Sequence, residues 1–468
     1  MDLEPAVQVP FQKALNASTS PVHHILTGSF RSLSLFLLAF SPLQLTVNLV
    51  QTIPAFGPHQ YIGLGPRTQR EDVRYAYTTS WALPPQLQSW AIEQQPDGLR
   101  VRFVDSVDIS TSTSIPLRSS LSLPSRDFVV HHRPPPYSHI YSAGGPSAQV
   151  HAPPPAGSTG FGPHVQEIYF VPQAEWASAD KTQKALRYGS HGIEFAFPAG
   201  SQALAFIPVL GGSTIEVYMR VADGSLTHID TSPAPQREGG EVEEDGPRHV
   251  KVHPNGRVLY CVTEHSNYLD LYTITPPNGQ TTVLTYVASR SLIPPHLRTE
   301  GHTDGAQPTY RGDTLLLAPS TAEQPAPQSI FATTRGGEGE TTRGWVGVWR
   351  LDAEGMFAGD VENNPYLVER YEAATPGGKA HALDVLPKDG DAGKDGEMWV
   401  LLTDDSPPHP GVRVLEWDGW LWRGGGTRLR EVAAWPPPGF YDSSAESAQE
   451  QEGEPERMAG GSHAVWLD

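Results

Sequence analysis

Cysteine is almost absent from this chain of 468 residues, in which Cys261 is the only one. A single thiol excludes an internal disulfide, so the composition gives no support for secretion, and we expect a protein of the cytoplasm. Long apolar runs are absent as well. The most apolar segment, LSLFLLAF at 33–40, is far shorter than the roughly 20 residues that cross a bilayer, and we interpret it as a core strand.

Positive charge is scarce. The chain has 33 Lys and Arg against 52 Asp and Glu, which gives a net charge of −19 at pH 7. Such a surface repels nucleic acid and anionic membranes, so we expect neither as a partner. An anionic ligand would need a local group of basic residues that works against this field.

Recognisable metal and nucleotide motifs are also missing. The stretch DGDAGKDGE (389–397) has the wrong spacing for a calcium loop, and the His pairs at 23–24 and 131–132 lack carboxylate or cysteine partners at ligand spacing. We find no phosphate-binding glycine loop, nucleophile elbow or C-x-x-C pair. The sequence therefore predicts no metal site.

Turn-forming residues are abundant, with 45 Gly and 45 Pro, which makes long helices unexpected. Apolar residues alternate at period two in stretches such as VRYAYTTSW and HVKVHP, as in half-buried β-strands. A unit of up to four such strands recurs at an irregular spacing of roughly 40 to 65 residues, longer after the degenerate copy near Ser112, which is within or near the range of propeller and solenoid repeats. Its copies begin near His59, Ser112, His191, His249, Thr314 and His381.

The two ends of the chain complement each other. The N-terminal stretch VHHILTGSF resembles late strands of the unit, whereas Ser462–Asp468 (SHAVWLD) resembles a first strand with nothing after it. Together they make a seventh unit, as in a β-propeller that closes by pairing its termini. We therefore predict an all-β fold: a seven-bladed propeller that forms one domain over 21–468. We expect a disordered arm at 1–20 and loop insertions near 236–246, 388–397 and 441–460.

Antiparallel connectivity places the start of a blade's innermost strand and the end of its second strand at one face, near the axis. Arg248 precedes the inner strand HVKVHP, and Glu264 ends the following strand RVLYCVTE. Arg335 occupies the position of Glu264 in the next blade, and His191 opens the inner strand of the preceding one. We expect these four side chains to converge. Equivalent positions that would extend the group are held by His249, His381, His463 and Asp404.

Each of these residues also has a plain structural interpretation. A His that opens an inner strand can satisfy loop carbonyls, and a lone Arg at a loop edge is usually solvated. Convergence of four acid–base and cationic groups favours a site instead. The tripeptide RGD (311–313) is interpreted as a chance match, and YRGD (310–313) as a loop that leads into the sixth blade.

The stretches PRHVKVHPNGRVLYCVTE, FATTRG, GWVGVWRL, ATPGGKAHALDV and HAVWLD, in this order, resemble the fungal 3-carboxy-cis,cis-muconate lactonizing enzymes. These enzymes are similar to the 6-phosphogluconolactonases among the seven-bladed lactonase-type propellers. The resemblance implies cofactor-independent cyclisation of a muconate to a muconolactone in aromatic catabolism. It also implies acid–base roles for His191 and Glu264 and carboxylate binding by Arg248 and Arg335, to which we add His381.

The residues leave two questions open. His191 is our first choice as the proton donor, since its ordinary pKa lies near neutrality, whereas Glu264 would need burial to raise its pKa, or would orient the histidine. Lactone hydrolysis, or a propeller that binds a protein without catalysis, are the alternative functions. The expected partner is a small-molecule polycarboxylate substrate, and a homo-oligomer is compatible with the sequence.

Overall fold

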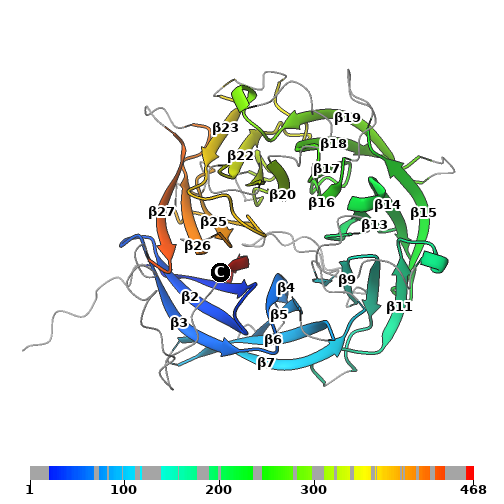
Figure 1. Ribbon diagram of the computed structural model, residues 1–468, viewed down its shortest axis with the longest axis horizontal. Coiled ribbons are helices and arrows are strands. Elements are labelled where there is room, and N and C mark those ends of the chain that lie inside the picture. Colours follow the sequence, from blue (N-terminus) through cyan, green and yellow to red (C-terminus); the bar gives the residue numbers. More distant parts are fainter. Residues whose placement is uncertain are drawn as a thin grey trace, which may run out of the picture.

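The alternating stretches form seven four-stranded antiparallel sheets arranged as blades around a central axis (Figure 1). The computed structural model describes residues 21–67, 73–81, 84–96, 98–110, 116–118, 139–155, 158–175, 189–198, 202–235, 245–277, 282–297, 310–320, 324–337, 342–359, 364, 366–390, 393, 396–406, 410–421, 427–437 and 460–468. This confirms the predicted all-β, seven-bladed propeller.

The blades are numbered in chain order, and each is given from its innermost strand outward. Blade 1 consists of β28 (Gly461–Trp466), β1 (His23–Ser29), β2 (Ser34–Ser41) and β3 (Thr46–Pro54). Blade 2 consists of β4 (His59–Arg67), β5 (Val73–Ser80), β6 (Gln86–Gln95) and β7 (Gly98–Asp108). Blade 3 consists of β8 (Pro116–Arg118), β9 (Ile140–Gly144), β10 (Ser147–His151) and β11 (His164–Tyr169).

The other four blades follow the same order. Blade 4 consists of β12 (Glu194–Ala196), β13 (Leu204–Val209), β14 (Thr214–Arg220) and β15 (Leu226–Pro233). Blade 5 consists of β16 (Pro247–Val252), β17 (Val258–Thr263), β18 (Tyr268–Ile274) and β19 (Leu284–Ser291). Blade 6 consists of β20 (Tyr310–Leu317), β21 (Ser329–Gly336), β22 (Trp345–Arg350) and β23 (Val368–Glu372). Blade 7 consists of β24 (Leu383–Pro387), β25 (Met398–Asp404), β26 (Gly411–Trp417) and β27 (Leu429–Trp435). Short 3₁₀ helices lie at η1 (Gln173–Glu175), η2 (Leu210–Gly212) and η3 (Pro295–Leu297).

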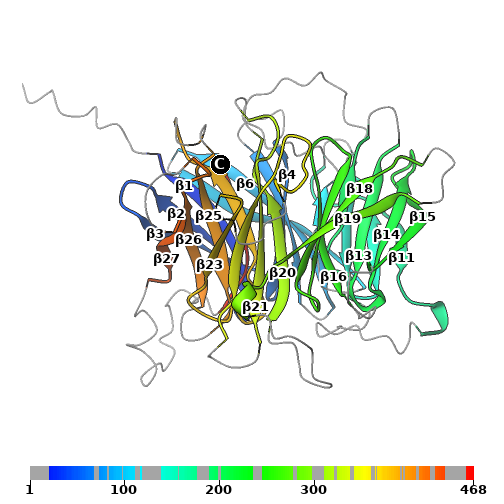
Figure 2. The same ribbon diagram turned by 90° about the horizontal axis from the view of Figure 1, so that it is seen from above.

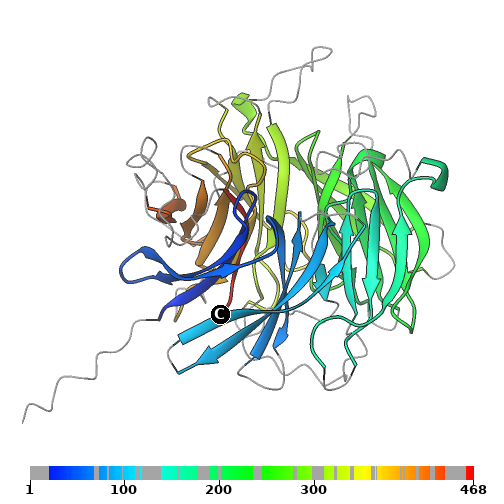
Figure 3. The ribbon, with the colours of Figure 1, turned by 60° about the horizontal axis from the view of Figure 1, so that its bottom comes forward.

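The ring closes where the two ends of the chain meet. Strand β28 pairs antiparallel with β1, so that Ile25 lies opposite Trp466 and Leu26 opposite Val465. It also lies against β4, β24 and β25 of the neighbouring blades (Figure 3). The predicted closure by the terminal strands is therefore confirmed.

The core of the described residues lies between blades. Seven clusters of buried apolar side chains form, and each is shared by two neighbouring blades, with the pair formed by blades 7 and 1 included. The segment 33–40 supplies Phe36, Leu38 and Phe40 to one of them, as a core strand should. Cys261 is fully buried within the cluster between blades 4 and 5. Because the inter-blade faces take up the apolar side chains, the axis remains available for polar ones. Figure 2 shows the ring from the side, with strands such as β16, β20 and β21 running from one face toward the other.

Three predicted strand boundaries were wrong. YRGD is not a loop, because Tyr310–Asp313 forms the first half of β20, where the expected start was Thr314. Arg248 lies inside β16 rather than before it. His191 precedes β12 by three residues, and Ser190 forms isolated bridges to Gly145 and Val209. In β16 and β20 main-chain pairing continues past the point where the apolar alternation fades, whereas before β12 it is reduced to the isolated bridges of Ser190.

The disordered arm predicted at 1–20 lies outside the described residues, as do 236–244 and 441–459 of the predicted insertions. The ends of the insertion at 388–397 are joined, because the Lys388 amide donates to the Glu397 carbonyl at 3.1 Å and Lys388 Nζ lies 2.8 Å from Glu397 Oε2. Asp245, near the end of the first insertion, is buried. Among the described residues, no helix has the length and apolar character needed to traverse a bilayer.

Candidate functional site

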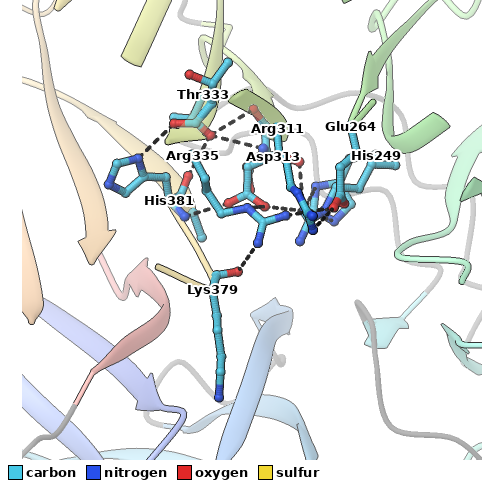
Figure 4. Close-up of polar contacts among 12 residues, drawn as sticks. His249, Glu264, Arg311, Asp313, Thr333, Arg335, Lys379 and His381 are labelled. Carbon is cyan, nitrogen blue, oxygen red and sulfur yellow. Dashed lines mark hydrogen bonds and ion pairs between the residues drawn. The ribbon is translucent and has the colours of Figure 1, made fainter. Parts of the chain in front are cut away.

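Three successive blades bring the predicted residues together at one face of the propeller. Arg248 comes from β16, Glu264 follows β17 and Arg335 lies near the end of β21. His191 stands just before β12 in blade 4. These four residues thus lie at one face of the propeller, as antiparallel connectivity predicted. Figure 4 shows the cluster around Glu264 and Arg335.

Glu264 bridges the two arginines. Its Oε2 accepts a hydrogen bond from Arg248 Nε at 2.9 Å, and its Oε1 accepts one from Arg335 Nη2 at 3.0 Å. Arg311 Nη1 lies 3.7 Å from the same Oε1. Burial acts to raise the pKa of Glu264, but the charges of Arg335 and Arg248 outweigh it and lower the pKa to about 2. Glu264 is therefore an ionised anchor at neutral pH and not a proton donor.

Asp313 is a second carboxylate in the same cluster, and the sequence analysis missed it. Its Oδ1 lies 2.7 Å from Arg248 Nη1 and 3.4 Å from Arg335 Nε. Its Oδ2 accepts a hydrogen bond from the His381 amide at 2.6 Å. The side chains of Arg248, Arg335, Glu264 and Asp313 are 11%, 12%, 3% and 1% exposed. These two arginines and two carboxylates thus form a buried network in which their own four charges balance, with Arg311 at its edge.

Irregular strand pairing shapes the wall of the adjoining cavity. In a regular strand, consecutive side chains point to opposite sides of the sheet. The pairing of β16 with β17 shifts register between Pro247 and His249, and that of β20 with β21 shifts between Gly312 and Leu315. Consecutive residues then line the same cavity, Arg248 with His249 and Asp313 with Thr314.

The cavity opens to solvent, and the space between its walls, open solvent included, is about 400 Å³. His191, Arg248, His249, Asp313 and Thr314 form one wall, from blades 4, 5 and 6. The rest of the lining comes from blades 1, 2 and 7 and their loops: Phe30, Tyr61, Lys379, Ala380, Ala382 and Ser462. Glu264 and Arg335 do not line it and support Arg248 from behind.

His191 stands beside this charged network in a neutral state. Burial lowers its pKa, and the charge of Arg248 lowers it further, to about 3. Its ring lies edge-on to that of His249, with the centroids 6.4 Å apart. Burial and Arg248 also hold the pKa of His249 well below its usual value. At neutral pH both imidazoles can accept a proton, and neither carries a charge.

His463 and His381 hold the position of His191 in blades 1 and 7, and their surroundings differ from those of His191. His463 stacks on Tyr61 with the ring centroids 3.7 Å apart. His381 is fully buried: its Nδ1 lies 3.0 Å from the Thr334 carbonyl, and its main chain is held by Asp313 and Thr333 (Figure 4). Its neighbours at 380 and 382 line the cavity, but His381 itself does not. Substrate binding by His381 remains a prediction.

Asp404 does not extend the cluster. Its carboxylate accepts a hydrogen bond from Thr375 at 2.6 Å and another from Arg413 of β26 at 3.3 Å.

Three lining residues that sequence reasoning missed are Asp313, Tyr61 and Lys379. Asp313 was available from YRGD, had that segment been interpreted as an inner strand. Tyr61 is the third residue of β4, and Lys379 belongs to the GGKAHA stretch already used for the resemblance. Within the described ranges, no three His, Cys, Asp or Glu side chains are grouped as a metal site would require.

Comparison with known proteins supports the same fold. Residues 191–312 match the family described as "Lactonase, 7-bladed beta-propeller". The chain is 26% identical over 385 residues to "Muconate cycloisomerase 1" of Cutaneotrichosporon cutaneum, covering 82% of this chain and 87% of that protein. It is 24% identical over 253 residues to "Carboxy-cis,cis-muconate cyclase" of Neurospora crassa, covering 54% of this chain and 58% of that protein.

A solved structure gives the same result for the fold. The periplasmic gluconolactonase of Pseudomonas aeruginosa superimposes with a TM-score of 0.55 at 18% identity, over 88% of this chain and 97% of that one. At this identity the likeness concerns the fold alone. Together with the seven sheets, it shows that the chain has a seven-bladed β-propeller fold, which over residues 191–312 is similar to the lactonase family.

Proposed function

We propose that this protein catalyses the intramolecular cyclisation of 3-carboxy-cis,cis-muconate, or a similar polycarboxylate, to a muconolactone. The observation that carries the proposal is the shared cavity wall of Arg248 and His191, a carboxylate-binding group beside a titratable imidazole. The similarity to proteins named muconate cycloisomerase and carboxy-cis,cis-muconate cyclase supports it.

The reaction needs no external nucleophile. One substrate carboxylate attacks a carbon of the conjugated diene and forms the ring C–O bond. The π electrons of that double bond move toward a second carboxylate, and the neighbouring carbon then takes up a proton. Atoms and electrons balance, because the product is an isomer of the protonated substrate. The protein must hold the reacting conformer, stabilise the charge that develops on the second carboxylate and supply the proton.

Arg248 is suited to the carboxylate on which charge develops. Its Nε and Nη1 are occupied by Glu264 and Asp313, while among the described residues its Nη2 has no hydrogen-bond partner. Arg335 and Glu264 keep the guanidinium in place, so Arg335 acts as a positioning residue. A fixed donor costs no reorganisation when charge appears in the transition state.

His191 is the proposed proton donor. In the empty site its pKa of about 3 leaves it neutral, because burial and Arg248 oppose a positive charge. A polyanionic substrate at Arg248 offsets that positive charge and raises the pKa of the imidazole. Substrate binding would therefore bring the proton that cyclisation consumes.

The test is to incubate the purified protein with 3-carboxy-cis,cis-muconate and follow the loss of diene absorbance in the ultraviolet. The product is identified by NMR. Formation of the muconolactone supports the proposal. Absence of turnover, with a folded protein by circular dichroism, would overturn it.

Hydrolysis of a lactone is the second candidate, because a neutral His191 could accept a proton from an attacking water. The matching family description and the fold shared with a gluconolactonase favour it. Acid release from neutral lactones in a pH-stat, unaffected by Arg248→Lys, is the expected result for this alternative.

A further inference from the structure

The wall of the cavity opposite Arg248 carries a cation of a different kind. Lys379, which precedes β24, lines the cavity together with Phe30 from the loop after β1. Figure 4 shows the side chain of Lys379 running away from the arginine cluster. Its Nζ lies 5.5 Å from the ring centroid of Phe30 and 5.2 Å from that of Trp81.

The two rings support the ammonium group from two blades. Their centroids are 5.3 Å apart and the rings are tilted by 40°. Cation–π contact holds a lysine with less loss of positive charge than a carboxylate would cause, because the ring face carries no net charge. Lys379 is exposed, so its ammonium remains accessible to a solute that enters the cavity.

Lys379 is not paired with a carboxylate in the way that Arg248 and Arg335 are. Glu264 and Asp313 balance Arg248 and Arg335, whereas among the described residues no carboxylate lies within ion-pair distance of Lys379 Nζ. Burial raises the pKa of Asp405 and the charge of Lys379 acts to lower it, but the ion-pair partner of Asp405 is Arg31, whose Nε lies 3.2 Å from Oδ1.

Lys379 is also tied to the buried network through its main chain, because its carbonyl accepts a hydrogen bond from Arg335 Nη1 at 3.1 Å. The main chain at Lys379 is thus fixed relative to the guanidinium of Arg335.

We propose that Lys379, resting on Phe30 and Trp81, binds a second carboxylate of the ligand, distant from the one held by Arg248. The ligand class is a planar molecule with at least two separated carboxylates, whose flat face can also contact the ring of Phe30. The inference rests on the proposed function for the identity of the substrate, but not for the chemistry of binding. It makes Lys379 a specificity-determining residue.

The first measurement is of steady-state kinetics with 3-carboxy-cis,cis-muconate. Lys379→Met keeps much of the side-chain stem and removes the charge, so we expect KM to rise at least about tenfold with kcat changed less than about twofold. Lys379→Arg, which preserves charge and ring contact, should recover most of the loss. Equal KM values for the wild type and Lys379→Met would overturn the inference.

The second measurement does not depend on turnover. Benzene-1,2,4-tricarboxylate, a planar and unreactive tricarboxylate, is titrated into each variant by calorimetry. We expect Lys379→Met to weaken binding of this probe at least about tenfold. Added salt should weaken binding to the wild type more steeply than binding to Lys379→Met. Binding that depends on Lys379 without turnover of the carboxymuconate would support the inference and overturn the proposed cyclisation. Binding to the wild type that is too weak to measure, or the same in Lys379→Met, would overturn the inference.

Lys388→Met is the control for a lysine that contacts an aromatic ring elsewhere. The Nζ of Lys388 lies 4.9 Å from the centroid of Trp399 and also pairs with Glu397 at 2.8 Å and Glu416 at 2.7 Å, so the fold of this variant is first checked by circular dichroism. Lys388 follows β24 instead of preceding it, which places it at the opposite face of the blade, away from the cavity lining. This variant should retain the wild-type KM and probe affinity, whereas a tenfold loss in it as well would count against a specific role for Lys379.

Discussion

Arg248 and Arg335 were predicted to bind substrate carboxylates in the same way, yet their surroundings differ. Arg248 lines the cavity, whereas Arg335 lies behind it and contacts Glu264, Asp313 and the carbonyl of Lys379. A guanidinium group can make these contacts at once because its donors form a planar fork, which an ammonium lacks. The two positions should therefore respond differently to the same substitution.

We predict that Arg248→Lys lowers kcat/KM for the carboxymuconate at least about tenfold, since the two-donor contact with a carboxylate is lost. Arg335→Lys should lower kcat/KM less than Arg248→Lys, because Arg335 does not line the cavity. Both variants should melt at a lower temperature than the wild type, because one ammonium cannot hold both Glu264 and Asp313 in a buried setting. Kinetics and calorimetric melting of both variants check this. The assignment fails if Arg248→Lys retains full kcat/KM.

The titration of His191 makes a prediction about pH. If the imidazolium of His191 is the acid, the fraction of free protein that carries it falls about tenfold for each pH unit above the pKa of His191, which is about 3. The value of kcat/KM should then fall with a slope near −1 between about pH 6 and pH 8. By contrast, kcat reports the protein–substrate complex, in which bound substrate raises the pKa of His191. The value of kcat should therefore stay constant with increasing pH until that raised pKa is reached.

His191→Asn should give a lower kcat/KM that no longer depends on pH in this range. A flat wild-type profile would show that another group, or solvent, delivers the proton.

At the scale of strands and blades, β28 makes the clearest prediction. It is the innermost strand of blade 1, and Ala464, Val465 and Trp466 contribute to two inter-blade clusters. Deletion of Ser462–Asp468 removes these contacts and leaves β1 with an unpaired edge near the axis. We expect an insoluble protein, or a melting temperature lower by more than about 10 °C.

Deletion of Ser443–Arg457, which lies outside the described residues, provides the control. We expect the wild-type melting temperature for it, because this acidic stretch lacks apolar side chains for a core. A β28 deletion that melts like the wild type would contradict the closure.

The strands and blades also show which features could be predicted from the sequence and which could not. Period-two alternation and the matching ends of the chain predicted the blades and their closure, because these are local patterns repeated seven times. Strand parity placed Arg248, Glu264 and Arg335 at one face for the same reason. Asp313 was missed because a shift in pairing between Gly312 and Leu315 turns its side chain toward the arginines, and no residue pattern announces such a shift.

Lys379 was missed for a different reason. Its partners Phe30 and Trp81 come from blades at the other end of the sequence, so only the closed ring brings the three together. Contacts made where the ring closes depend on the relative placement of all the blades.

For the whole molecule, the buried histidines determine how stability depends on pH. Burial lowers the pKa of His59 and His151 to about 4 and those of His191 and His463 to about 3, and it holds the pKa of His249 well below its usual value. The unfolded chain binds protons at these positions below about pH 6.5, and the folded protein does not. Their stabilisation is therefore complete above that pH and is lost as the pH falls. Asp384 acts in the opposite direction, since burial raises its pKa to about 6 and the folded form takes up its proton first.

Five histidines outweigh one aspartate, so the unfolded state binds about four more protons than the folded state near pH 5. The free energy of unfolding should then fall by about 5 kcal/mol for each unit of pH in that region. Glu264 adds nothing here, because its lowered pKa matters only below about pH 4.5. Urea unfolding at about pH 7.5 and pH 5 measures the difference. His59→Gln removes one titrating group and should reduce the slope by about 1.4 kcal/mol per unit. Equal unfolding free energies at the two pH values would mean that these imidazoles gain protons in the folded protein as readily as in the unfolded chain.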